Sequence, residues 1–401
     1  MKIDFSLEKL IFFLSLWSVG CASLNPIILI PGDGGNQLEA KLNRTNAVHY
    51  ICEKVSDYFN IWLNLELLVP LVIDCWIDNI KLEYNNVTRT TKSPDGVEIR
   101  VPGFGGTETV EWLDPSHASS GAYFKDIVNV LVNNGHVRNK TIKGAPYDFR
   151  RAPNENQDYF VKLKKLIEET YEENGKAQVI LLAHSMGSLM SLYFLNQQSQ
   201  YWKDTYIKNM VTLAGVWGGS MKAVKVYAIG DDLGSYALRE SVLRAEQISS
   251  PSLAWLLPSK LYWKPDEVLV ETEKKNFTVN DLKEFFYDIS FPDGWEMRKD
   301  TEPFQLNFKP PGVEVHCLFG VNVNTVERLK YKPRTWLDGY PTLVYGDGDG
   351  TVNRRSLEGC LHWRGYQKQK IHATPFDKVD HLQILRDANV LNYIAALIND
   401  I

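Results

Sequence analysis

The sequence lacks the motifs by which most metal-dependent and nucleotide-dependent enzymes are recognised. It contains neither H-E-x-x-H nor paired C-x-x-C motifs, so we expect no catalytic metal. The glycine-rich stretch 32–36 does not end in the Lys-Ser/Thr of a P-loop, and D-G-D-G at 347–350 lacks the spacing and final glutamate of an EF-hand. The prediction is a protein that works without a metal or a cofactor.

Net positive charge and long apolar runs are also missing. The net charge is −5 and the pI is near 6.0, which gives no support for a nucleic-acid partner. Residues 10–19 are apolar but too few to span a bilayer, and no later stretch offers a span free of charges. With Lys2 and Lys9 before this run and Cys21-Ala22-Ser23 after it, residues 1–23 resemble a secretory signal peptide.

Cysteine is sparse, with five residues in the chain. Cleavage of the signal peptide would remove Cys21 and leave an even number, which in a secreted chain favours disulfides over buried free thiols. Three pairings of the remaining four are possible. Proximity along the sequence favours Cys52 with Cys75 and Cys317 with Cys360.

Four N-x-T sequons fit the same secretory compartment, because an asparagine must be exposed to carry a glycan. These candidate glycosylation sites are Asn43, Asn86, Asn139 and Asn276.

Residues 178–191, Q-V-I-L-L-A-H-S-M-G-S-L-M-S, have the pattern of a buried strand that turns sharply into a helix. A serine at the apex of such a turn projects from the carboxyl edge of a parallel sheet, and the next backbone amide points to where an acyl oxyanion forms. Only small residues fit two positions to either side of the serine, and Ala183 and Gly187 are small. The pattern predicts an α/β-hydrolase fold with Ser185 as nucleophile and the Met186 amide as an oxyanion donor.

A second oxyanion donor is expected from the loop after the first apolar strand. The strand at 26–31 runs into Gly-Asp-Gly-Gly-Asn at 32–36, where glycines let backbone amides approach a ligand. In an α/β-hydrolase this loop completes the oxyanion hole, so we assign that role to the Asp33 amide. A plain tight turn is the alternative.

The acid of a catalytic triad is predicted after a strand at 342–345, where G-D-G-D-G follows. A carboxylate at the end of a strand orients the triad histidine and stabilises its cation. Asp347 is still close to the strand, so Asp349 is the predicted acid.

The base must follow the acid in this fold. His372 alternates with apolar neighbours in a predicted strand and His362 adjoins Trp363, so both are better explained as structural residues. His381 precedes the predicted final amphipathic helix, 382–398, and is the predicted base. His184 is excluded because its ring, beside the nucleophile on a tight turn, points elsewhere.

The segment between the first two mature cysteines is dense in large apolar side chains. It is too short and interrupted to cross a bilayer, so its apolar surface is either the core of a disulfide-tied excursion at about 47–80 or a patch that docks on lipid. The residues leave both possibilities open. The candidate membrane-binding side chains are Trp62, Leu63, Leu65, Leu67 and Leu68.

About a hundred residues interrupt the alternation of strands and helices after a predicted strand at 207–214. This aromatic-rich insertion, 216–312, is predicted to form a cap or lid over the active site. After the insertion, further strands of the α/β pattern are predicted at 313–319 and 342–345. Because no repeat or low-complexity tract marks a second domain, we expect 24–401 to form a single α/β-hydrolase domain.

Five ungapped strings make the sequence similar to the lecithin:cholesterol acyltransferase family, and most similar to its lysosomal phospholipase A branch. They are P-G-D-G-G-N-Q-L-E-A-K-L (31–42), I-W-L-N-L-E-L-L-V-P (61–70), G-A-P-Y-D-F-R-R-A-P-N-E-N (144–156), A-H-S-M-G (183–187) and G-D-G-D-G-T-V-N (346–353). The resemblance covers nearly all of the mature chain. It implies the triad and oxyanion amides proposed above, both disulfides, and a membrane-binding role for the 47–80 excursion.

The resemblance also implies transfer of a fatty acyl chain from a glycerophospholipid, through an acyl-serine, to water or to a lipid alcohol such as ceramide. The implied partner is a phospholipid membrane surface, and we expect a monomer in the lysosomal lumen or outside the cell. Two alternatives remain, which are a secreted phosphatidylcholine:sterol O-acyltransferase and a catalytically inactive lipid-binding module of the same fold. A serine peptidase is a third alternative, which the apolar segment disfavours.

Overall fold

The computed structural model describes residues 24–234 and 238–399. The predicted signal peptide, 1–23, lies outside the described residues. Within them, no helix is long and apolar enough to cross a membrane.

Six parallel strands form the centre of the fold, in the order β15-β12-β9-β8-β1-β7. The four inner strands are buried almost throughout, which explains why each reads as a continuous apolar run in the sequence. The strands are β1 (Ile27–Ile30), β7 (Ile142–Gly144), β8 (Val179–His184), β9 (Ile207–Leu213), β12 (Val315–Val321) and β15 (Ile371–Asp377).

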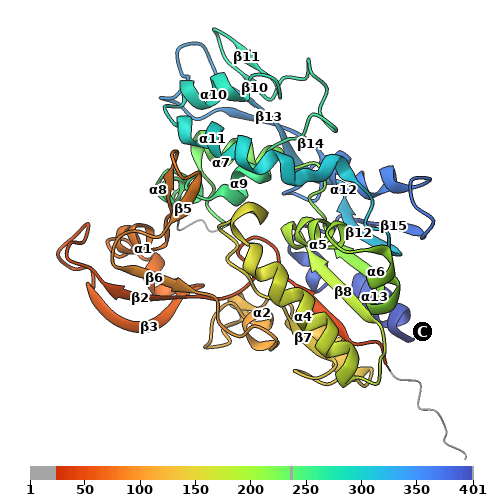
Figure 1. The fold of residues 1–401 in the computed structure, drawn as a ribbon. Coiled ribbons are helices and arrows are strands. Elements are labelled where there is room, and N and C mark those ends of the chain that lie inside the picture. Colours follow the sequence, from red (N-terminus) through yellow and green to blue (C-terminus); the bar gives the residue numbers. More distant parts are fainter. Residues whose placement is uncertain (1–23, 235–237, 400–401) are drawn as a thin grey trace, which may run out of the picture.

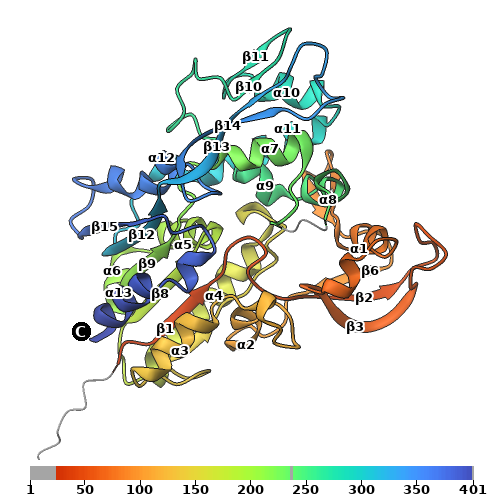
Figure 2. The same cartoon turned by 180° about the vertical axis from the view of Figure 1, so that it is seen from behind.

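Helices cover both faces of this sheet, with α4 and α6 on one face and α3 and α13 on the other (Figures 1 and 2). A helix-covered parallel sheet with a sharp turn after β8 confirms the predicted α/β-hydrolase fold. The helices are α2 (Glu108–Glu111), α3 (Lys125–Asn133), α4 (Gln157–Glu173), α5 (Met186–Asn196), α6 (Gln200–Tyr206) and α13 (Ala388–Asn399).

The final helix differs from the prediction, which placed it at 382–398. The segment instead forms a short 3₁₀ helix, η6 (Gln383–Leu385), and then α13. Two aspartates explain the break, because each caps its own helix: the Asp380 carboxylate accepts from the Gln383 amide at 2.7 Å, and the Asp387 carboxylate accepts from the Asn389 amide at 2.9 Å.

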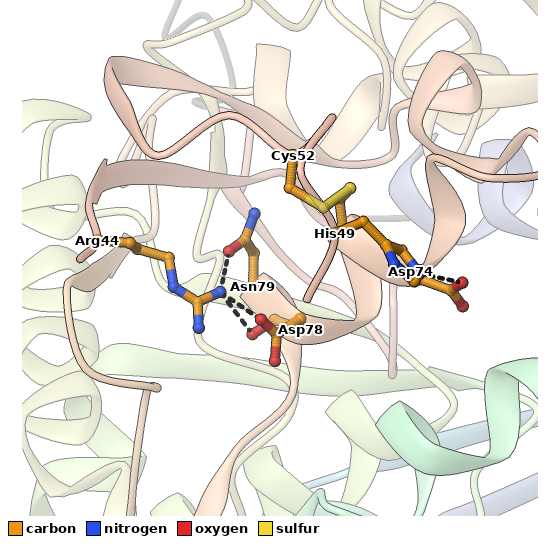
Figure 3. The surroundings of a disulfide bond; sticks show 7 residues. Arg44, His49, Cys52, Asp74, Asp78 and Asn79 are labelled. Atoms are coloured by element: carbon orange, nitrogen blue, oxygen red, sulfur yellow. Dashed lines mark hydrogen bonds and ion pairs between the residues drawn. A yellow bond between two sulfur atoms is a disulfide. The ribbon is translucent and has the colours of Figure 1, made fainter. Parts of the chain in front are cut away.

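The excursion between β1 and β7 contains a three-stranded antiparallel sheet in the order β3-β2-β6 and the helix α1. A disulfide joins Cys52 to Cys75 and so ties the loop before β3 to α1. Figure 3 shows Arg44 beside this bond, with its guanidinium 2.7 Å from the Asp78 carboxylate. The elements are β2 (Leu38–Asn43), β3 (Val55–Trp62), η1 (Leu65–Leu68), α1 (Ile73–Ile80), β4 (Glu83–Asn85), β5 (Thr90–Lys92) and β6 (Val97–Arg100).

The cap gathers at one end of the molecule around a hydrophobic cluster of its own (Figure 1). Its small sheet has the order β11-β10-β13-β14, so the predicted insertion at 216–312 is completed by a later hairpin. The elements are α7 (Met221–Ile229), α8 (Glu240–Gln247), α9 (Pro251–Trp255), β10 (Val270–Glu271), β11 (Asn276–Phe277), α10 (Leu282–Asp288), α11 (Pro292–Thr301), β13 (Val323–Lys330), β14 (Thr342–Gly348) and, after it, α12 (Arg354–Leu357).

The prediction that the strand at 342–345 belongs to the central α/β sheet is therefore wrong, because this strand is part of the small cap sheet. β14 is longer and pairs antiparallel with β13, and Leu329 of β13 packs into the cap cluster. Only two of the eight residues of β13, Thr325 and Leu329, are buried, so this half-exposed antiparallel strand carries no continuous apolar run.

The second disulfide joins Cys317 of β12 to Cys360. The structure therefore contains both of the pairings that sequence proximity favoured. All four sequon asparagines are exposed, as a glycan requires.

Candidate active site

Ser185 occupies the turn between β8 and α5 in a conformation that is rare for a residue with a side chain. Its φ is 53° and its ψ is −124°, so the backbone is strained at the serine. A Cβ at Gly187 would lie 2.4 Å from the Pro31 carbonyl oxygen and 2.5 Å from that of Ile30. The close approach of β1 explains why the second residue after the serine must be glycine.

Ser185, His381 and Asp349 form a continuous chain of hydrogen bonds. Ser185 Oγ lies 2.9 Å from His381 Nε2, and His381 Nδ1 lies 2.7 Å from Asp349 Oδ2. Asp349 is fully buried, and the other two side chains are nearly so. The arrangement lets the imidazole take a proton from the serine while the carboxylate stabilises the resulting cation.

Asp349 reaches this position from the cap hairpin, directly after β14. Its second oxygen, Oδ1, accepts hydrogen bonds from the backbone amides of Thr351 (3.0 Å) and Val352 (2.7 Å). Asp347 points elsewhere and pairs with Arg354 Nη1 at 2.8 Å. The geometry therefore places Asp349, and not Asp347, against His381, and the role of Asp349 as the triad acid stays a prediction.

The other two candidate bases lie away from the serine. His372 in β15 is 2.7 Å from the Glu314 carboxylate, and exposed His362 packs edge-on against the Tyr262 ring. Neither is within hydrogen-bond distance of Ser185.

The glycine-rich loop after β1 lies directly against the nucleophile. A Cβ at Gly32 would be 2.7 Å from the Cβ of Ser185, so the loop can come this close only without a side chain. Within the described residues, the amides of Asp33 and Met186 have no hydrogen-bond acceptor. Their role as oxyanion donors stays a prediction.

His184, excluded as a base, holds the loops around the site together. Its Nε2 donates to the His381 carbonyl oxygen at 2.9 Å, and its Nδ1 accepts from the Tyr123 hydroxyl at 2.5 Å. The Tyr123 oxygen in turn accepts from the Gly32 amide at 3.0 Å. Burial, with the nearby His381, holds the pKa of His184 well below its usual range, so the ring stays neutral and keeps its acceptor nitrogen. The sequence gives no signal for a contact between residues 61 positions apart.

A cavity of about 780 Å³ opens at Ser185 and His381. Its walls are mostly apolar and come from the excursion, as with Trp62 and Leu68, and from the cap, as with Leu253 and Leu256. A volume of this size suits a lipid chain better than a small polar substrate. The titratable side chains in its walls are those of Asp33, Lys222, Asp231, Glu246 and His381.

Two carboxyl groups in the cavity have raised pKa values. Burial raises the pKa of Glu246 from 4.5 to about 8, with a further contribution from the negative charge of Asp33. The surrounding cavity walls likewise raise the pKa of Asp33 from 3.8 to about 6 by desolvation, although its side chain is open to the cavity and Lys222 opposes the shift. At acidic pH both groups are neutral, so the cavity carries less negative charge.

Glu246→Gln should make stability less dependent on pH. Between the ordinary pKa of 4.5 and the raised value of about 8, the folded protein keeps a proton that the unfolded chain has lost, so stability falls as the pH rises through this window. We expect wild type and variant to unfold at the same temperature below pH 4.5, and the variant to unfold roughly 2–4 °C higher near pH 8.

Thermal unfolding across the pH range measures this difference. The matched control is Glu172→Gln, which changes an exposed glutamate of α4 and should shift the midpoint equally at every pH. If the unfolding temperatures of wild type and Glu246→Gln changed with pH in parallel, the raised pKa of Glu246 would be contradicted.

The candidate membrane-binding side chains divide into two groups. Leu68 is buried and Trp62 donates from Nε1 to the Gly34 carbonyl oxygen at 2.8 Å, so both support the cavity wall. Leu65 is exposed, whereas Leu63 and Leu67 are half-buried.

Two exposed apolar residues outside that candidate set extend the surface around Leu65. Val69 is 45% exposed, and Leu71 is 75% exposed with a φ of 76°, which few residues other than glycine adopt. Leu65 and Val69 also line the cavity, so its opening is bordered by apolar surface. We call Leu65, Val69 and Leu71 the apolar rim.

Comparison with known proteins finds a matching family profile and similar proteins over most of the chain. A sequence profile described as Lecithin:cholesterol acyltransferase matches residues 58–388. The protein named "Lysosomal phospholipase A and acyltransferase" from Bos taurus is 49% identical over 370 residues, which is 92% of this chain and 90% of that protein. Its Homo sapiens counterpart is 47% identical, with coverages of 92% and 89%. The "Phosphatidylcholine-sterol acyltransferase" of Gallus gallus is 44% identical over 364 residues, with coverages of 90% and 87%. The chain belongs to the lecithin:cholesterol acyltransferase family.

Proposed function

We propose that this protein takes a fatty acyl chain from a glycerophospholipid onto Ser185 and passes it to water or to a lipid alcohol such as ceramide. The observation that carries the proposal is the 2.9 Å contact between Ser185 Oγ and His381 Nε2 in the wall of an apolar cavity. The similarity to proteins named phospholipase A and acyltransferase, at 47–49% identity, exceeds that to the chicken sterol acyltransferase, at 44%.

In the first half-reaction, Ser185 Oγ attacks the ester carbonyl carbon and His381 Nε2 takes the serine proton. The amides of Asp33 and Met186 donate to the oxyanion that forms. The bond between the carbonyl carbon and the glycerol oxygen then breaks, and His381 returns the proton to the departing lysophospholipid.

In the second half-reaction, His381 deprotonates water or a lipid alcohol, whose oxygen attacks the acyl-serine. The ester bond to Ser185 breaks, the serine regains its proton, and a free fatty acid or an acylated alcohol leaves. Every step uses residues of this chain and needs no metal or cofactor.

The apolar rim suits a phospholipid surface as the partner of the enzyme. Exposed leucine and valine side chains at a cavity mouth can enter the lipid layer, so the acyl chain passes from bilayer to cavity without crossing water. All three triad residues and the cavity come from one chain, so a monomer would suffice.

Charged residues at the apolar rim should weaken membrane binding. The double variant Val69→Asp/Leu71→Asp removes two side chains whose burial in lipid is worth about 2–3 kcal/mol, so we expect about a 100-fold loss in affinity for phosphatidylcholine vesicles. Vesicle co-sedimentation measures this change. The matched control is Val137→Asp/Val161→Asp, which alters two exposed valines outside the rim and should bind like wild type. Equal losses in the two double variants would contradict docking at the rim.

The acyl acceptor is tested with vesicles of phosphatidylcholine that carry a labelled acyl chain together with ceramide and cholesterol. We expect labelled fatty acid and labelled O-acylceramide. A predominance of cholesteryl ester would favour the sterol acyltransferase, and no acyl release by a folded wild-type protein would favour the inactive lipid-binding module.

We further propose a location in the lysosomal lumen or outside the cell. Two disulfides and four exposed sequon asparagines fit an oxidising secretory compartment, and the names of the most similar relatives above favour the lysosome.

A further inference from the structure

Glu314, His316 and His372 bring a carboxylate and two imidazoles together outside the active site. Side chains two residues apart in extended chain point to the same side, which places Glu314 and His316 together at the start of β12. β12 and β15 are parallel neighbours in which His316 is the direct partner of His372. The pairing of β12 with β15 therefore brings the side chains of Glu314, His316 and His372 close together, although the two strands are far apart in the sequence.

The ligand atoms are close enough to share one small ion. Glu314 Oε1 lies 2.7 Å from His372 Nε2 and 3.9 Å from His316 Nε2, and all three atoms lie within 4.8 Å of one another. Bond lengths of about 2.0–2.2 Å to zinc place tetrahedral ligand atoms about 3.4 Å apart. This spacing lies between the 2.7 Å and 3.9 Å that separate Glu314 Oε1 from the two imidazole nitrogens. The imidazole rings stack with their centres 4.4 Å apart.

A neighbouring helix fixes the ring that is least accessible. His316 Nδ1 lies 2.8 Å from the Tyr393 hydroxyl of α13, which leaves Nε2 facing Glu314. Metal-binding histidines in proteins usually use their other ring nitrogen in this way. The His316 side chain is 7% exposed, whereas those of Glu314 and His372 are each 39% exposed, so an ion can enter from solvent.

We propose that Glu314, His316 and His372 bind a divalent transition-metal ion of the zinc type, with a water molecule in the fourth position. Two imidazole nitrogens and one carboxylate oxygen form a set that zinc prefers, whereas magnesium and calcium prefer oxygen ligands throughout. The sequence gives no motif for this site, because the carboxylate and His372 are 58 positions apart.

The ion would link two strands of the central sheet. β15 is an edge strand, and its chain continues through residue 377 into the loop that carries His381. The site lies at the amino ends of β12 and β15, and Asp349 lies against Gly320 near the carboxyl end of β12, roughly 15 Å away along the strand. Its effect is therefore to stabilise the edge of the sheet, and it takes no part in acyl transfer.

Binding of Zn²⁺ to the full protein at neutral pH tests the proposal, with equilibrium dialysis for affinity and X-ray absorption for the ligand shell. We expect one ion surrounded by nitrogen and oxygen atoms at about 2.0–2.2 Å, with the scattering pattern of imidazole. Glu314→Gln and His372→Gln change half-buried side chains to residues of similar size, so they should fold, and each should weaken binding by roughly 100-fold. Zinc should also raise the unfolding temperature of wild type and leave that of both variants unchanged.

Two controls decide where the zinc is held. His362→Gln alters an exposed histidine outside the cluster and should bind like wild type. His381→Gln removes the triad imidazole and should also keep the ion. Binding that survives in Glu314→Gln and His372→Gln, or that disappears in His381→Gln, would overturn the proposal, as would the absence of zinc binding by wild type.

Discussion

Ser185→Ala is expected to abolish labelling by a fluorophosphonate and to lower acyl-ester cleavage by roughly 10⁴-fold or more. The reason is that, among the described residues, Ser185 Oγ is the hydroxyl that lies within hydrogen-bond distance of His381 Nε2, at 2.9 Å, on a turn that faces the cavity. The proposed oxyanion amides and the cavity remain in place, so a small residual rate should persist. Gel fluorescence with the labelled phosphonate and release of labelled fatty acid from vesicles measure the two effects.

Ser188→Ala is the matched control for this variant. Ser188 is fully buried in α5, three residues after the nucleophile, and within the described residues its hydroxyl has no hydrogen-bond partner. Its loss should change neither labelling nor activity. Thermal unfolding of both variants excludes misfolding as the cause. Labelling that persists in Ser185→Ala would show that another residue is the nucleophile.

The sequence predicted the parts of the fold that depend on local pattern. The central strands around Ser185 carry continuous apolar runs because they are buried on both faces, so β1, β8 and β9 were found to within about a residue. The turn at Ser185 was visible because a glycine is required at position 187, where a Cβ would lie 2.5 Å from the Ile30 carbonyl oxygen of β1.

The parts that depend on long-range pairing could not be predicted. The cap sheet joins β10 to β13 across more than fifty residues, and nothing in either short strand indicates its partner. The apolar rim has the same origin, because the loop conformation at Leu71, and not its composition, decides that this side chain is exposed while Leu68 is buried. The contact between Tyr123 and His184 likewise appears only once β8 and the chain before α3 are brought together.

Asp349→Asn and Asp347→Asn should have very different effects, although the two residues lie two positions apart in one glycine-rich run. We expect Asp349→Asn to lower kcat by about 10⁴-fold and Asp347→Asn to change it by less than about twofold. Hydrolysis of a water-soluble ester measures kcat without a membrane step, and thermal unfolding confirms that both variants fold. Asp347 is the matched control, because its carboxylate pairs with Arg354 at the surface and does not touch His381.

The large effect at Asp349 follows from its hydrogen bonds. The amides of Val352 and Thr351 donate to Oδ1 at 2.7 and 3.0 Å, so an asparagine would keep its carbonyl oxygen there and turn its NH₂ group toward His381 Nδ1. An NH₂ group donates, and His381 Nδ1 would therefore have to accept and lose its proton. The proton would move to Nε2, the atom that must receive the proton of Ser185, and the imidazole could no longer act as a base. The defect should therefore appear in kcat with little change in KM, and an equal loss in Asp347→Asn would show that the acid has been assigned to the wrong aspartate.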